Sequence, residues 1–195
     1  IVGDGILLKY CGSEENVDIP DGVKVVGASS FQKNDTIKSV VIPESVTKIW
    51  MGAFFMSSLE SVTLPDSITE IESYAFYSTE LKEITLPAGL KNLESSMFVN
   101  CGNLTKVDLP QGLEIIGDQA FNSCVGLTDI IIPDGVYEIG NGAFAFCDNL
   151  GTLTIPSSVY YIGRDTISYS TTIEAPANSY AIDYAIENGY EYIAK

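Results

Sequence analysis

Residues 127–147 read LTDIIIPDGVYEIGNGAFAFC, and this stretch contains the whole unit that recurs along the chain. A leucine is followed by alternating aliphatic residues and a proline, then by a Val-x-x-Ile segment and by Ala-Phe. The proline makes the period visible, because seven of the eight prolines are spaced by 22 or 23 residues. These seven are Pro20, Pro43, Pro65, Pro87, Pro110, Pro133 and Pro156.

Other residue types recur at fixed distances after each proline, and each recurring position forms a column of the repeat. Aliphatic residues stand three and six positions after each proline, as at Val136 and Ile139, and a large apolar residue stands eleven positions after it. In chain order this large residue is Phe31, Phe54, Phe76, Phe98, Phe121, Phe144 and, in the last unit, Ile167. The columns therefore predict one continuous apolar core that runs through all the units.

Each part of the unit predicts a local structure. An alternation such as Val62-Thr63-Leu64 predicts a short strand with one face inward. The proline ends that strand because it has no N–H group to donate to a ladder. Asp-Gly after the proline, as at Asp134-Gly135, favours a turn. The Gly-x-x-Ala-Phe segment then predicts a short helical turn that places the Phe side chain in the core.

The repeat predicts one domain with the fold of an α/β-type solenoid that is mainly β. We expect short parallel strands, short helical turns and a helical cap at the C-terminal end, because a single coil cannot bury its own apolar face. The predicted parts are an N-terminal capping coil at 1–19, seven repeats at 20–175 and a C-terminal cap at 176–195.

The last residues are expected to cover the strand edges and apolar columns that an open solenoid exposes at its end. Asn178 or Ser179 is suited to cap the start of a short helix, and Gly189 is suited to end it. The predicted apolar face of this helix comprises Ala181, Ile182, Tyr184 and Ala185. Residues 190–193 are expected to add a final strand.

The composition argues against several classes of function. With 26 acidic and 10 basic residues, the formal net charge is −16, which disfavours binding to nucleic acid and to anionic membranes. The chain has no histidine, the commonest general base and metal ligand. No stretch approaches the roughly 20 apolar residues that span a bilayer. We therefore expect no enzyme activity, no cofactor and no membrane insertion. The chain is expected to be a fragment of a longer protein, and the fragment is expected to be a monomer.

Cys101, Cys124 and Cys147 share one column of the repeat. Three thiols in a row offer no closed tetrahedral set of metal ligands, and we interpret them as small buried residues. A disulfide between two neighbours is the main alternative. Cys11 is expected to be a lone thiol. No calcium-binding loop or catalytic triad is present, so no catalytic or metal-binding residue is predicted.

The unit at 127–147 resembles the BspA-type bacterial leucine-rich repeat, whose strand signature is Leu-x-x-Ile-x-Ile. The segment 4–20 resembles the first coil of that family and the segment 179–190 its closing cap, so the resemblance covers essentially the whole chain. It implies a leucine-rich-repeat superhelix. It also implies a secreted or surface-attached bacterial protein that adheres to host proteins or other cells, with its signal peptide or anchor outside this fragment.

Apolar residues that the repeat does not require are the first candidates for binding. In the second unit these are Trp50, Met51, Phe55 and Met56, and Tyr77 follows Phe55 by one unit. The two residues after each column phenylalanine are expected to face outward, and an exposed apolar stripe of this kind is a candidate interface. The alternative is that these side chains fold back onto the turns or contact a neighbouring domain.

The outward face of the strands is the second candidate, because the resemblance makes it the usual ligand surface. Its polar residues include Thr63, Glu83, Thr85, Lys106 and Asp108. They can form hydrogen bonds with a protein or a glycan, and they can equally form a plain solvated sheet.

The sequence thus favours a non-enzymatic extracellular binding or adhesion module. Its expected partner is a protein or glycan on host or neighbouring cells. The first rival is a structural spacer that displays other domains of a longer surface protein. The second is a carbohydrate-active domain that uses two carboxylates.

Overall fold

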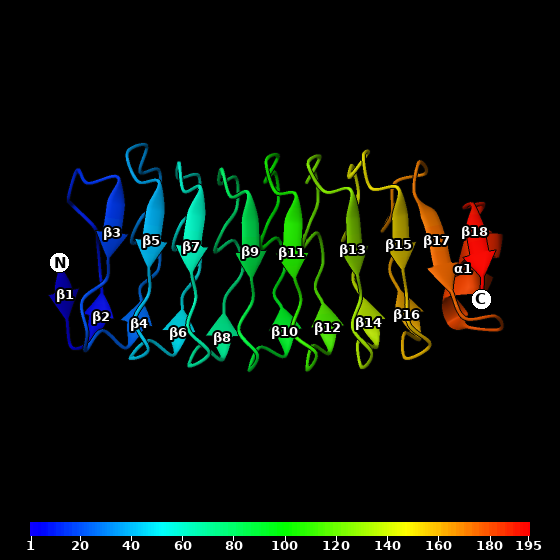
Figure 1. The fold of residues 1–195 in the computed structure, drawn as a ribbon, viewed down its shortest axis with the longest axis horizontal. Coiled ribbons are helices and arrows are strands. Elements are labelled where there is room, and N and C mark those ends of the chain that lie inside the picture. The colour runs from blue at the N-terminus through cyan, green and yellow to red at the C-terminus, as the bar shows by residue number, and fades with distance from the viewer.

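The computed structural model describes residues 1–195 and shows coils stacked along one long axis, with the two termini at opposite ends (Figure 1). Each coil contributes one strand to each of two rows, as the short alternating segments predicted. The first row comprises β3 (Asn16–Asp18), β5 (Ser39–Val41), β7 (Ser61–Thr63), β9 (Glu83–Thr85), β11 (Lys106–Asp108), β13 (Asp129–Ile131), β15 (Thr152–Thr154), β17 (Thr172–Ala175) and β18 (Tyr192–Ala194).

The second row consists of two-residue strands formed by the Val-x-x-Ile segments on the opposite wall, preceded by an N-terminal hairpin (Figure 1). These are β1 (Val2–Gly3), β2 (Ile6–Leu7), β4 (Val25–Val26), β6 (Lys48–Ile49), β8 (Glu70–Ile71), β10 (Asn92–Leu93), β12 (Ile115–Ile116), β14 (Glu138–Ile139) and β16 (Tyr161–Ile162). The antiparallel pair β1–β2 closes the N-terminal end, and every other pair is parallel.

The strand pairs join equivalent positions of successive repeats, so Ser39 lies beside Ser61 and Glu83 beside Lys106. The first row is not one continuous sheet. Its hydrogen-bonded order is β3-β5-β7, then β9-β11, then β13-β15-β17-β18. The ladder is therefore interrupted after β7 and after β11, and both interruptions lie on the face where polar candidates were predicted.

The phenylalanine column forms a stack of buried rings along the axis. Neighbouring ring centroids from Phe31 to Phe144 lie 4.9 to 5.5 Å apart, with interplanar angles of 12° or less. Tyr10 extends the stack at the N-terminal end, with its centroid 5.1 Å from that of Phe31. A strand spacing of about 4.8 Å suits ring stacking, so the sheet register and the aromatic column support each other.

The segments before and after each phenylalanine form tight turns. In the second repeat, the N–H of Ala53 donates to Trp50 O at 3.2 Å and the N–H of Phe55 donates to Gly52 O at 3.0 Å. Gly52, where the second of these turns begins, and Met56, which follows it, both have positive φ. The predicted helical turn therefore does not continue as an α-helix. The first left-handed column comprises Ser29, Gly52, Tyr74, Ser96, Gln119, Gly142 and Asp165, and the second comprises Lys33, Met56, Ser78, Asn100, Ser123 and Phe146.

The C-terminal cap contains the one helix, α1 (Tyr180–Asn188). Ser179 precedes it as N-cap and Gly189 ends it in the left-handed conformation, with φ of 75°. Its buried residues are Ala181, Ile182, Tyr184 and Ala185, as predicted. The expected final strand is present as β18, which pairs in parallel with β17 but begins at Tyr192, two residues later than predicted. Helix and strand together cover the last repeat.

Candidate binding surfaces

The first surface, which we call the turn patch, comprises Met51, Phe55, Met56, Tyr74 and Tyr77. Met51 and Met56 are 52% and 48% exposed, while Phe55 and Tyr77 are half-buried and stack with ring centroids 4.8 Å apart. Met51, Phe55 and Tyr74 line a hollow of about 310 Å³. The structure thus brings four of the five predicted apolar candidates into one area. Of these four, Met51 and Phe55 line the hollow itself. The fifth candidate, Trp50, is half-buried and does not line it.

Tyr74 was not predicted from the sequence. It is 40% exposed, and its ring centroid lies 6.0 Å from that of Tyr77. It belongs to the first left-handed column, where the equivalent residues of other repeats are Gly, Ser, Gln or Asp. The signal that could have found it is therefore an aromatic residue in a column that is otherwise small or polar.

Three large apolar or aromatic residues occupy left-handed positions: Met56, Tyr74 and Phe146, with φ of 56°, 62° and 58°. This conformation costs an L-residue roughly 1–2 kcal/mol, and it is unusual for bulky side chains. All three side chains are exposed, so burial in the core does not offset the cost. The same conformation recurs at these positions in the other coils, so it belongs to the turn of the repeat, and what sets these three residues apart is the size of their exposed side chains.

The second surface, the strand groove, contains all five polar candidates. Thr63 projects from β7, Glu83 and Thr85 from β9, and Lys106 and Asp108 from β11, and together they line a hollow of about 290 Å³. This hollow lies at the interruption of the ladder between β7 and β9. These residues were identified from the sequence, in which nothing indicated the interruption.

The polar groups of the strand groove largely satisfy one another. Lys106 Nζ lies 3.1 Å from Asp108 Oδ2, and Thr85 Oγ1 donates to the same oxygen at 3.1 Å. The hydrogen bond from Lys106 lowers the pKa of the Asp108 carboxyl, and the same bond raises the pKa of Lys106. A ligand that binds Lys106 or Asp108 in this groove would have to replace these existing contacts.

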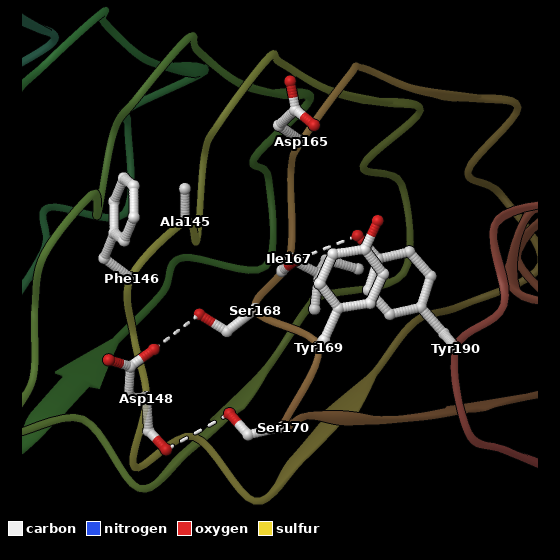
Figure 2. Close-up of a pocket in the computed structure, with 9 residues that line it drawn as sticks. All are labelled: Ala145, Phe146, Asp148, Asp165, Ile167, Ser168, Tyr169, Ser170 and Tyr190. Carbon is white, nitrogen blue, oxygen red and sulfur yellow. Dashed lines mark hydrogen bonds between the residues drawn. The ribbon is translucent and has the colours of Figure 1, made fainter.

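A third surface lies beside the C-terminal cap, and Figure 2 shows the nine residues that line it. This C-terminal hollow has a volume of about 520 Å³. Phe146 and Tyr169, which are 65% and 74% exposed, stand on opposite sides of Ile167. The remaining residues are Ala145, Asp148, Asp165, Ser168, Ser170 and Tyr190.

The C-terminal hollow was not predicted from the sequence, although two irregularities mark it. The seventh unit has Ile167 where the six earlier units have Phe, and Pro156 and Pro176 are only 20 residues apart. In the structure both irregularities fall in the coil that forms this hollow, and Ile167 is part of its lining.

The three cysteines of the column are buried free thiols. Each Sγ donates to a carbonyl oxygen of the preceding coil, as Cys101 does to Phe76 O at 3.1 Å and Cys147 to Phe121 O at 3.0 Å. Burial raises the pKa of all three thiols, that of Cys147 to about 12. The interpretation as small buried residues is confirmed, and no disulfide joins neighbours. Cys11 is exposed.

No group of three or more His, Cys, Asp or Glu side chains is arranged to hold a metal ion. The one helix, α1, lacks the length and apolar character needed to cross a bilayer.

The repeat matches a known family model. The model, described as "BspA type Leucine rich repeat region", matches six copies over residues 7–124 and 47–174. No match is found among curated proteins.

Solved structures resemble the fold of this chain. A leucine-rich cell surface protein from Faecalibacterium prausnitzii is 22% identical, with 85% of this chain and 70% of that one covered and a TM-score of 0.57. A leucine-rich repeat protein from T. pallidum is 23% identical over 97% and 91% of the two chains, with a TM-score of 0.55. The pneumococcal vaccine antigen PcpA is 14% identical over 99% and 93%, with a TM-score of 0.51. At these identities the likeness concerns the fold alone.

Proposed function

The chain belongs to the BspA type leucine-rich repeat family, and we propose that it is a non-enzymatic binding module that engages a protein through its turn patch. We further propose that it acts outside the cell or attached to its surface, in adhesion to host or neighbouring cells. The description of the Faecalibacterium relative as a cell surface protein supports this location. Solenoids suit such a role because their extended surfaces present many side chains to a partner.

One observation carries the proposal: exposed methionines and aromatic rings meet at the turn patch where the fold does not need them. Met51 and Met56 adapt to irregular partner surfaces, since the thioether chain is flexible and polarizable. Tyr74, Phe55 and Tyr77 provide large rings of the type that is enriched at the centres of protein interfaces. The patch offers few hydrogen-bonding groups, which favours a protein over a glycan.

The strand groove is a second candidate surface, supported by the convergence of Thr63, Glu83, Thr85, Lys106 and Asp108 on one hollow. Its mixed donors and acceptors suit a polar ligand, either a glycan or an extended peptide. We rank it below the turn patch because Lys106, Asp108 and Thr85 already bind one another.

The test replaces the patch residues with residues that other repeats carry at the equivalent positions. The triple variant is Met51→Ser, Met56→Asn and Tyr74→Ser, which introduces the residue types found at Ser73, Asn100 and Ser96. The chain and the variant are immobilised and probed with host matrix proteins, mucins and whole cells. Loss of hot-spot side chains costs about 2 kcal/mol or more, which corresponds to roughly thirtyfold weaker binding.

A matched control removes exposed apolar residues elsewhere. The control variant Val125→Ser, Ile131→Thr and Tyr160→Thr alters side chains that are 44%, 74% and 65% exposed and lie outside the turn patch. It should bind as the unaltered chain does. If the patch variant keeps full binding, the partner engages another surface, and the strand groove becomes the better candidate. If the folded chain binds none of these partners, the structural spacer becomes the better explanation.

A further inference from the structure

The C-terminal hollow has a rigid apolar floor and walls. Ile167 forms the floor, and Tyr190 O–H donates to the backbone oxygen of Ile167 at 2.9 Å (Figure 2). The ring of Tyr169 stacks on that of Tyr190 with centroids 5.0 Å apart, and the ring of Tyr184 also stacks on that of Tyr190, at 5.7 Å. The wall at Tyr169 is thus fixed by the packing of the cap.

The opposite wall is the exposed ring of Phe146. Phe146 and Tyr169 stand at equivalent positions of successive repeats, 23 residues apart, where the first five repeats carry Lys33, Met56, Ser78, Asn100 and Ser123. Phe146 takes up a left-handed conformation there with φ of 58°. Small or polar residues serve this position in most coils, so two large exposed rings are not a requirement of the fold.

The polar groups of the C-terminal hollow have spare acceptors and few spare donors. Ser168 Oγ donates to Asp148 Oδ1 at 3.1 Å, and Ser170 Oγ donates to Asp148 O at 3.2 Å (Figure 2). The Tyr190 hydroxyl is also engaged. What remains is the carboxylate of Asp165, the second oxygen of Asp148 and the hydroxyl of Tyr169. No Lys or Arg lines the hollow.

A ligand for such a site must supply donors and positive charge. A lysine ammonium or an arginine guanidinium has donors and no acceptor, and both are attracted to the faces of aromatic rings. Their alkyl stems cover apolar surface while the charged head stays at the rim. A neutral sugar lacks the positive charge and brings acceptors that would find few donors here.

We propose that the C-terminal hollow binds a lysine or arginine side chain presented by a basic segment of a partner protein. The stem lies over Ile167 between Phe146 and Tyr169, and the charged head meets Asp148 or Asp165. The formal charge of −16 attracts a basic segment over longer range. This site is separate from the turn patch, and the proposal does not depend on it.

The test uses an amide-capped Gly-Arg-Gly peptide and a matched peptide in which the neutral isostere citrulline replaces arginine. Titration into the ¹⁵N-labelled chain is followed by chemical shifts. The arginine peptide should shift the amide signals of Ile167, Ser168 and Tyr169 to saturation, and the citrulline peptide should shift them weakly. Asp148→Asn with Asp165→Asn should weaken binding about fivefold or more, since the double variant removes the charge-assisted bond whichever of the two carboxylates meets the charged head.

Two controls separate a specific site from general attraction to an acidic protein. Asp21→Asn with Glu44→Gln makes the same change in net charge at exposed positions of the first repeats and should leave binding within about twofold. Phe146→Asn, which introduces the residue found at position 100, should weaken binding, while the triple variant of the turn patch should not. The spectrum of each variant reports whether it is folded.

Any of the following results would overturn the proposal. The first is equal binding of the arginine and citrulline peptides. The second is unchanged binding by the folded Asp148→Asn, Asp165→Asn variant, or shifts spread evenly over the molecule. The third is saturable binding of a neutral sugar such as cellobiose at these amides in place of the arginine peptide, which would assign the hollow to a glycan.

Discussion

Replacing Gly140 with alanine should destabilise the chain, although alanine usually stabilises a glycine position. Gly140 follows β14, where its N–H donates to Ile116 O of the preceding coil at 2.8 Å. A Cβ atom at this position would lie 2.6 Å from the backbone nitrogen of Asp118 and 2.7 Å from the carbonyl carbon of Gly117. The two coils are too close at this point for a methyl group.

The size of the effect follows from two opposing terms. Ordinary contact begins at 3.4 Å, so the coils must separate by about 0.8 Å from the 2.6 Å contact, and overpacking of this kind costs roughly 1–3 kcal/mol. Alanine also lowers the conformational entropy of the unfolded chain, which stabilises the folded state by about 0.4–1 kcal/mol. The net loss is about 1–2 kcal/mol, which lowers Tm by roughly 2–8 °C in a chain of this length.

Gly151→Ala is the matched control, because a Cβ at Gly151 would meet nothing closer than Thr128 O at 3.9 Å. Only the entropy term then applies, so Tm should stay the same or rise by a few degrees, on the order of 1–4 °C. Thermal unfolding followed by circular dichroism measures both variants. If Gly140→Ala is as stable as the unaltered chain, or if both variants shift in the same direction, the steric argument is refuted.

Three further predictions concern buried rings, buried thiols and surface charge. Phe98→Ala should lower the free energy of unfolding by about 3–5 kcal/mol in denaturant titrations, because loss of a fully buried ring leaves a cavity between two stacked neighbours. A loss below about 1 kcal/mol would contradict the stabilising role of the phenylalanine stack. In the native protein at pH 8, a thiol reagent should modify Cys11 alone, because burial raises the pKa of Cys101, Cys124 and Cys147. Prompt labelling of more than one thiol would disprove this. Hydrogen bonds from Lys82 and Lys38 lower the pKa of the Glu60 carboxyl in the folded chain to about 2. The ionised carboxylate therefore stabilises the folded chain fully above about pH 4.5, and this stabilisation is lost as the pH falls through the folded-state pKa of about 2. Glu60→Gln should therefore reduce the loss in free energy of unfolding between these two pH values. An unchanged slope of that free energy against pH would count against the pairing of Glu60 with Lys82 and Lys38.

The repeat columns made most of the fold predictable from the sequence. Proline, the aliphatic pair and phenylalanine each recur at a fixed phase, and a residue that recurs in every coil must occupy the same environment in every coil. The strand rows and the phenylalanine stack follow from that argument. The helix α1 lies outside the repeats, and its buried face was predicted from its own apolar residues and capping signals. The left-handed columns did not, because Ser, Asn, Gly and Lys alternate there and share a backbone conformation without sharing a side-chain type.

The candidate surfaces were only partly predictable, for a related reason. Phe55, Met51 and Thr85 could be identified because they depart from a column or face outward from a strand. The hollows that these residues line depend on how closely neighbouring coils pack, as at the interruption of the ladder after β7. No single residue in the sequence indicates this packing. The C-terminal hollow combines Phe146, Ile167 and Tyr169 with Tyr190 of the cap, and the sequence alone does not show that these residues meet.

The direction of the parallel ladders also determines how the molecule would respond to force. The strands lie across the long axis in Figure 1, so the hydrogen bonds between coils run along it. Tension between the two ends would load these bonds one coil at a time, in the manner of a zipper, and each opened coil would release roughly 75 Å of extended chain. Single-molecule stretching should therefore record a series of small, nearly equal steps at low force. Such a protein would lengthen under load and yield gradually, as an elastic tether does, where a globular domain of the same size would give way in one event.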